Sequence, residues 1–263
     1  MRRSLLIILV LFGFLLAACA GGDNTSDQTD EQEDTSQFGP FEWDRDPGTI
    51  VVRIDTQPDQ ETPAFMMNSI PPCTVWGDSR VVWTARDGVG NQQVFEARIS
   101  DETMRSFLED IINRGFYTWE DEIVPSSSVD PQVETITVDL YDEVRTVRRF
   151  NSWPQNAYIF ILESCQKLSD EPTLVQPSGG WVSAWEIPRD YQAPSWYWPT
   201  DAAYTLADLT TQGQWVDGTL ATEIWLSTRQ ERDDIQVVEG EKAYKIGIIV
   251  PGISRDSMAP PAE

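Results

Sequence analysis

Residues 73–113 read CTVWGDSRVVWTARDGVGNQQVFEARISDETMRSFLEDIIN, and this stretch predicts a β-hairpin and a further strand that leads into an amphipathic helix. β-Branched and aromatic residues on both sides of Gly77-Asp78-Ser79 predict two strands joined by a tight turn, and QVFEARI predicts a third strand. Ser100 is expected to cap the helix, and Asp101 and Glu102 suit the positive end of its dipole. One face of this helix carries its apolar side chains, Met104, Phe107, Leu108, Ile111 and Ile112.

The same order of elements returns downstream, with no convincing residue identity between the two copies. ETITVDLYDEVRTVRRF, residues 134–150, alternates as two strands around Tyr141-Asp142-Glu143. Residues 153–169 predict a helix with Pro154 near its first turn. The inner face of this helix would hold Tyr158, Ile161, Leu162, Cys165 and Leu168. Antiparallel hairpins with helices on one face define an α+β fold with an antiparallel sheet.

Other strands are expected on both sides of these two hairpin-then-helix units. Upstream, the strands are predicted at Thr49–Thr56 and Ala64–Asn68. Downstream, we interpret residues 171–199, which are rich in Pro, Gly and Trp, as an irregular connector, followed by a short helix over residues 201–209 capped by Thr200. The C-terminal part is predicted to be β-rich, with strands within residues 214–229, 234–240 and 242–250 and turns at Asp217-Gly218 and Glu239-Gly240. The pattern leaves open whether these strands form a second sheet, and the tail after Gly252 is expected to fray.

The N-terminus predicts export. Arg2 and Arg3 precede an apolar run from Leu5 to Ala18, which has the length of a signal peptide and is too short for the ~20 residues of a membrane-spanning helix. The run ends in Leu16-Ala17-Ala18-Cys19, which resembles the lipobox of bacterial lipoproteins. The resemblance implies that residues 1–18 are removed and that Cys19 is lipidated. The alternative is an ordinary secretory signal followed by a chance cysteine.

The organisation of the rest follows from composition. Residues 20–37 are acidic and contain no aromatic side chain, so they cannot bury enough apolar surface to offset the entropy of ordering. We therefore predict four parts: a lipoprotein signal peptide at 1–18, an acidic disordered tether at 19–48, an α+β domain at 49–170, and a Trp-rich connector with a β-rich region at 171–263. The last part either continues the preceding domain or forms its own. Anchoring is expected to the cell membrane or the outer membrane, and Ala20 after the cysteine favours the outer one where there are two.

The lipobox also bears on the remaining cysteines. If Cys19 carries lipid, Cys73 and Cys165 are left as a pair. Outside the cytoplasm such a pair more often forms a disulfide than a metal site, and two separate buried thiols are the alternative. No metal site and no cofactor are predicted.

Charge limits the partners. The formal charge of −24 becomes −26 once the signal peptide and its two arginines are removed, and the whole chain contains three lysines. Such a chain is not expected to bind nucleic acid, and anionic headgroups should repel it, so the acyl chains would hold it at the membrane. The absence of histidine excludes Ser-His-Asp and Cys-His catalysis and zinc sites that use histidine.

Three weaker motifs bear on catalysis or metal binding. Ser164-Cys165-Gln166-Lys167 matches S-x-x-K, but no K-T-G follows and Ser164 falls within a predicted helix. Glu120-Asp121-Glu122 beside Trp119 is the first place to look for the paired carboxylates of a glycosidase, although acids this numerous usually form a solvated face. Asp44-Arg45-Asp46-Pro47-Gly48 resembles the start of a calcium loop but lacks the third ligand and the terminal Glu.

The aromatic residues of segment 181–198 are the most suggestive remaining feature. Flat rings on a loop can stack on sugar faces, whereas the same rings can also cover the sheet as core. The candidate ligand-binding residues are Trp181, Trp185, Trp196 and Trp198. We predict a non-enzymatic binding or assembly component of the bacterial envelope, with an envelope protein or a polysaccharide as its partner. The alternatives are a surface carbohydrate-binding module that uses this segment, and a carboxylate-dependent glycan hydrolase.

Overall fold

The computed structural model describes residues 41–57, 62–122, 132–140, 143–150, 152–230 and 235–256. The lipobox, Cys19 and residues 20–37 lie outside these ranges, as does the predicted turn at Tyr141-Asp142. The described chain belongs to one compact unit, Pro40–Glu263, with an α+β fold of two sheets and five α-helices. Within the described ranges, no helix is both long enough and apolar enough to cross a membrane.

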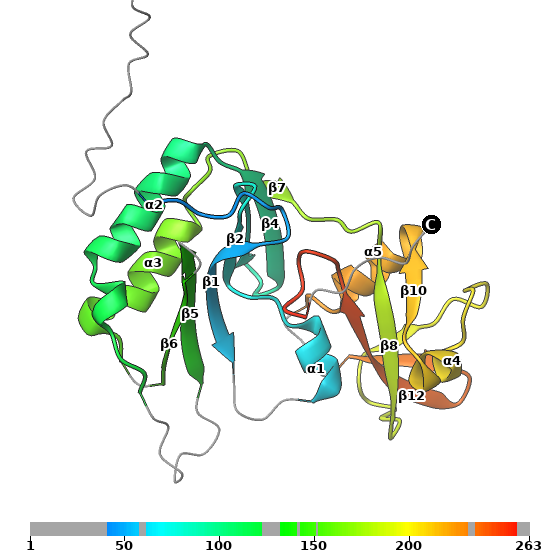
Figure 1. The fold of residues 1–263 in the computed structure, drawn as a ribbon. Coiled ribbons are helices and arrows are strands. Elements are labelled where there is room, and N and C mark those ends of the chain that lie inside the picture. Colours follow the sequence, from blue (N-terminus) through cyan, green and yellow to red (C-terminus); the bar gives the residue numbers. More distant parts are fainter. Residues whose placement is uncertain are drawn as a thin grey trace, which may run out of the picture. The chain divides into compact units, whose positions relative to one another are not determined.

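The first sheet is antiparallel throughout and has seven strands (Figure 1). Its strands, in chain order, are β1 (Ile50–Gln57), β2 (Cys73–Trp76), β3 (Arg80–Arg86), β4 (Gln92–Arg98), β5 (Val133–Leu140), β6 (Glu143–Arg149) and β7 (Thr173–Leu174). Their order across the sheet is β6-β5-β1-β2-β3-β4-β7. The hairpin predicted at Gly77-Asp78-Ser79 is therefore present, with Cys73 opposite Trp83. The two predicted hairpins lie on either side of β1.

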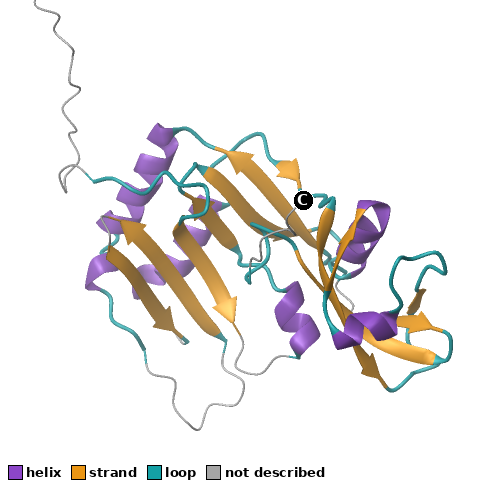
Figure 2. Ribbon diagram, turned by 45° about the vertical axis from the view of Figure 1, so that its right-hand side comes forward, coloured by secondary structure: helices purple, strands orange, loops and turns teal. Residues whose placement is uncertain are grey.

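Two helices cover the same face of this sheet (Figure 2). Helix α2 (Asp101–Asn113) begins after Ser100, whose side chain accepts a hydrogen bond from the backbone of Thr103. Helix α3 (Ala157–Cys165) follows a short 3₁₀ turn (Pro154–Asn156), so it is shorter at both ends than the helix predicted over residues 153–169. The predicted inner faces of both helices pack in the core, with Met104, Leu108 and Ile161 fully buried.

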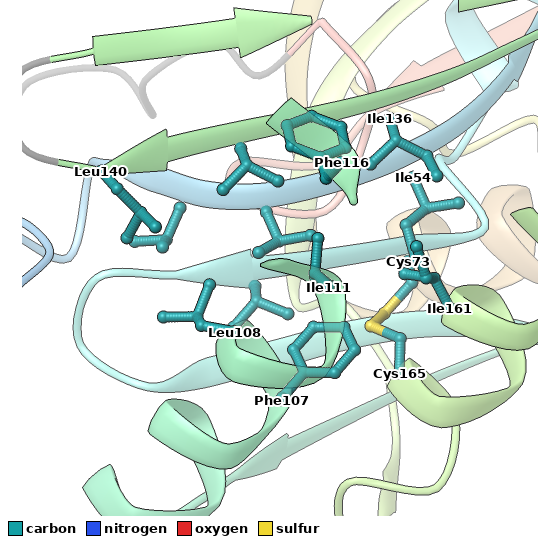
Figure 3. Packing of buried hydrophobic residues seen from close by; sticks show 14 of the residues in the cluster. Ile54, Cys73, Phe107, Leu108, Ile111, Phe116, Ile136, Leu140, Ile161 and Cys165 are labelled. Atoms are coloured by element: carbon teal, nitrogen blue, oxygen red, sulfur yellow. A yellow bond between two sulfur atoms is a disulfide. The ribbon is translucent and has the colours of Figure 1, made fainter. Parts of the chain in front are cut away.

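A disulfide between Cys73 and Cys165 crosses this core and joins β2 to the end of α3 (Figure 3). Both cysteines are completely buried among apolar side chains from the sheet and the two helices. The predicted disulfide is thus confirmed. It covalently ties the sheet to the helical layer that covers it.

The C-terminal strands form a second sheet, which answers the question that the sequence left open. Its strands are β8 (Gly179–Ile187), β9 (Ser195–Tyr197), β10 (Gln214–Asp217), β11 (Gln236–Glu239) and β12 (Lys242–Ile249), in the order β10-β8-β12-β11-β9. The sheet is mixed because β9 runs parallel to β11, while the other pairs are antiparallel. Helices α4 (Leu206–Thr211) and α5 (Gly218–Ser227) belong to this part of the chain.

The two sheets share a second hydrophobic core. Because side chains alternate along a strand, Val82 of β3 points away from the α2–α3 layer and packs with Val182 and Ile248 of the second sheet. Helix α1 (Pro63–Asn68) joins the sheets further, since the Asn68 amide bonds to both the carbonyl of Ile246 and the N–H of Ile248 at 2.9 Å. Gly247, between these two residues, permits the close approach, because a Cβ there would meet Met67 at 2.9 Å.

Several sequence predictions are wrong, and each error has a local cause. Ala64–Asn68 is helix α1 rather than a strand, because Thr62 caps it and Pro63 fits its first turn. The region 171–199 is not an irregular connector, because it contains the nine-residue strand β8, which lies between β10 and β12 in the second sheet. Alternate residues of β8, including Val182 and Ala184, are buried. The short helix is capped by Thr205 rather than Thr200.

Of the strands predicted within residues 214–229, only the first forms, as β10, and helix α5 begins directly after it at Gly218. The buried residues Ala221, Ile224 and Trp225 follow the helical period of i, i+3 and i+4, which the flanking β-branched residues obscured. The folded domain also extends further at both ends than the sequence predicts. Phe41 and Trp43, in the range assigned to the tether, are buried, and so are Ile253 and Ser254 in the tail that was expected to fray.

Replacing Ser100 by alanine should lower the free energy of unfolding by about 1 kcal/mol, because an N–H in the first turn of α2 loses its partner. Urea denaturation of the full chain measures this change. Ser106, exposed on the same helix, provides the control, since Ser106→Ala should not reduce stability. Equal losses at the two positions would contradict the capping role.

Candidate functional site

Two neighbouring hollows lie along helix α5, and we refer to them together as the α5 groove. The first has a volume of about 360 Å³, and its lining includes Trp196, Glu223, Leu226 and Ile235. The second has a volume of about 550 Å³, and its lining includes Trp198, Asp201, Tyr204, Trp215, Asp217 and Glu223. Glu223 lines both hollows, so the helix presents this carboxylate where they meet.

Two strands of the second sheet place the rings of the groove, and helix α5 places the carboxylate of Glu223. Strand β9 carries Trp196. Just beyond it, the backbone N–H of Trp198 donates a hydrogen bond to the carbonyl of Val238 at 2.9 Å. Strand β10 carries Trp215 at the opposite edge of the sheet. Helix α5 starts directly after β10, which brings Glu223 beside both sets of rings.

Each of these indoles is held by its neighbours. The ring of Trp215 meets Trp181 edge to face, with their centroids 5.8 Å apart. It also lies against the backbone of Gly179, where an added Cβ would stand 2.5 Å from the ring. Trp198 is buried, donates its indole N–H to the carbonyl of Tyr204 at 2.9 Å, and meets Trp196 edge to face at 5.7 Å. Contacts with neighbouring residues therefore hold these indoles in place.

The charge of the groove is negative. Asp201, Asp217 and Glu223 are exposed carboxylates, whereas no lysine or arginine lines either hollow in the part of the chain that the structure describes. In the same part, no group of three histidine, cysteine, aspartate or glutamate residues is placed to hold a metal ion. The carboxylates are thus placed to accept hydrogen bonds from a ligand that carries donors.

The structure separates the four candidate tryptophans. Trp196 and Trp198 line the groove, Trp181 supports Trp215 from β8, and Trp185 lines neither hollow. Trp198 belongs to the core, while the other three are partly exposed. Sequence reasoning missed Trp215, Tyr204 and Glu223. The signal for Trp215 was its place just before Asp217-Gly218, but that pattern was interpreted as a turn between strands.

The other motifs found in the sequence have structural roles. Asp121 accepts a hydrogen bond from the backbone of Arg148 on edge strand β6, and the N–H of Glu122 bonds to the Arg148 carbonyl, both at 2.8 Å. These acids therefore extend and protect the edge of the sheet. Lys167 of the S-x-x-K match pairs with Glu163 at 3.3 Å, and Ser164 lies within α3.

The calcium-like loop satisfies its own acids. The pKa of Asp44 lies below its ordinary value because the carboxylate accepts bonds from the N–H of Asp46 and then from the hydroxyl of Thr49. Asp46 in turn accepts a bond from the N–H of Gly48. The two aspartates thus shape a turn, which is the usual role of Asp in such loops.

A second polar cluster lies in the first sheet beside α3. The Tyr158 hydroxyl donates to the carbonyl of Asp55 at 3.2 Å and bonds to Thr56, and burial raises the pKa of this hydroxyl. Burial also raises the pKa of Glu134 on β5. None of these residues lines the α5 groove. The cluster therefore contributes to packing rather than to the candidate site.

Comparison with protein-family models, with characterised proteins and with solved structures gives no match to this chain. The assignment of a function therefore depends on the residues and their geometry.

Proposed function

We propose that the protein is an exported, lipid-anchored component of a bacterial cell envelope that binds its partner without catalysing a reaction. The observation that carries the binding role is the α5 groove, which combines pre-positioned indole rings with exposed carboxylates. Ligand sites of proteins commonly have this composition, with aromatic walls and a few polar groups that fix orientation.

Export and anchoring rest on the cysteines. The Cys73–Cys165 disulfide supports an oxidising compartment outside the cytoplasm. It also leaves Cys19, in the sequence that resembles a lipobox, as the one cysteine outside the pair. A diacylglyceryl group supplies the two acyl chains that stable anchoring requires, so the anionic ectodomain needs no attraction to the headgroups.

The absence of catalysis is supported by the composition of the chain. Without histidine, the common nucleophile-base pairs cannot form. The acids Asp121 and Glu122, which were the first candidates for a carboxylate pair, bind the backbone of β6 instead. A binding role therefore explains the groove with fewer requirements than an enzymatic one.

Lipidation can be tested by expressing the full chain in a bacterial host supplied with labelled palmitate. The wild-type protein should take up the label and sediment with membranes, and Cys19→Ser should lose both properties. Mass spectrometry of the N-terminal peptide should show cleavage before Cys19. A wild-type protein that is cut elsewhere and carries no lipid would overturn the anchor.

A further inference from the structure

We propose that the α5 groove binds an oligosaccharide without anionic groups, at least two sugar rings long. This inference rests on the proposed binding role and names its ligand class. Three features of the groove carry it: flat rings beside hydrogen-bond acceptors, the sign of the charge, and the division of the groove into two hollows.

The first feature is the pairing of flat rings with hydrogen-bond acceptors. The C–H faces of a sugar pack on indole, while its hydroxyl groups donate to carboxylates. Trp196 and Trp215 are partly exposed in the two hollows, and Asp201, Asp217 and Glu223 are exposed beside them. An apolar ligand would leave these acids unused. A sugar satisfies both kinds of surface.

The second feature is charge. Three carboxylates and no basic residue line the groove within the described ranges, so a phosphate, sulfate or uronate group would meet repulsion without a compensating ion pair. The formal charge of −24 over the whole chain adds to this repulsion. A neutral glycan carries no such penalty, and the carboxylates can accept its hydroxyl protons.

The third feature is the arrangement of the hollows along α5. One contains Trp196 and the other Trp215 with Tyr204, and Glu223 belongs to both. This places an aromatic surface on each side of a shared acceptor. One sugar ring can occupy each hollow, with Glu223 reaching hydroxyl groups near the linkage between them. Chain length should therefore affect affinity.

The rings are also held in place, which lowers the entropy lost on binding. Trp215 rests on Gly179 and contacts Trp181, while Trp196 contacts the buried Trp198. Tyr191 and Tyr197, by contrast, are strongly exposed and line neither hollow. Tyr191 therefore serves as a control ring from the same segment.

The test uses the full chain with Cys19→Ser, titrated by calorimetry and Trp fluorescence with cellohexaose, maltohexaose and chitohexaose. An oligogalacturonate provides an anionic probe, and spermine provides a cationic one. We expect saturable binding of at least one neutral glycan, weaker binding of its monosaccharide, and no binding of the oligogalacturonate. Trp215→Ala and Trp196→Ala should each weaken binding about tenfold or more, a change of ~1.4 kcal/mol. Tyr191→Ala should leave it unchanged.

Glu223→Gln covers the case in which a tryptophan variant fails to fold, since this side chain is exposed on α5. It should weaken glycan binding while the circular dichroism spectrum stays unchanged. Binding of only spermine or only the oligogalacturonate, or no binding by the panel, would overturn the glycan proposal without touching the palmitate result. Shortened glycan products would instead leave the groove assignment intact and overturn the non-enzymatic role.

Discussion

Replacing Cys73 and Cys165 together by alanine should lower the free energy of unfolding by about 4 kcal/mol. The disulfide joins residues 92 positions apart, so it removes a large loop entropy from the unfolded chain. Both cysteines are 0% exposed, and the variant also loses sulfur contacts in the core. Urea denaturation of the full chain with Cys19→Ser should show a lower midpoint. An unchanged midpoint would contradict this role.

Burial of the two cysteines predicts a second property of the same bond. Dithiothreitol should not reduce it in the folded protein, because a thiolate must reach a sulfur atom to attack it. Addition of urea should make reduction fast, and alkylation followed by mass spectrometry counts the thiols released. Rapid reduction without denaturant would show that the core opens locally around α3.

Replacing Asp55 by asparagine should lower the free energy of unfolding by about 3 kcal/mol. The Asp55 carboxylate pairs with the guanidinium of Arg255 at 2.7 Å, and the two side chains are 13% and 8% exposed, respectively. The Arg255 guanidinium also donates a hydrogen bond to the backbone carbonyl of Thr56 at 3.0 Å. The backbone carbonyl of Arg255 accepts a hydrogen bond from the Arg53 guanidinium at 3.0 Å. Without Asp55, this buried cation loses its counter-ion while its other bonds hold it in place.

The matched control is an exposed pair with the same atom separation. Lys242 and Glu186 approach to 2.7 Å, with side chains 58% and 54% exposed, so Glu186→Gln should change stability by less than about 1 kcal/mol. Urea denaturation at neutral pH measures both variants. If Asp55→Asn cost no more than Glu186→Gln, the C-terminal segment 251–256 would not depend on this ion pair.

The local order of elements was predictable because neighbouring residues decide it. The turn at Gly77-Asp78-Ser79, the cap at Ser100 and the apolar face of α2 depend on contacts within a few positions of the chain. The disulfide could be predicted from the count of cysteines together with the predicted export of the chain. Helix α1 also has a local signal, because Thr62 before Pro63 is a capping pattern. The apolar residues that follow favoured a strand at Ala64–Asn68, and this pattern was therefore missed.

The candidate site was only partly predictable. Trp196 and Trp198 were selected because aromatic residues crowd their segment, yet Trp215 and Glu223 lay in a region interpreted as strands on either side of a turn. Glu223 joins these rings because α5 follows β10 and lines one hollow with Trp196 and the other with Trp198 and Trp215. Composition can mark a segment as unusual, but it does not show which distant residues complete a groove.

The sequence by itself determined the charge, the exclusion of histidine chemistry, the hairpins with their helices, and the cysteine pair. Tertiary structure alone decided the second sheet, the groove, and the pairing of Asp55 with Arg255 across 200 positions. The physical reason is that helical period, caps and turns are set by interactions between near neighbours. Strand order and buried ion pairs depend instead on which distant segments meet, and that is decided by burial of the shared core around Val82, Val182 and Ile248.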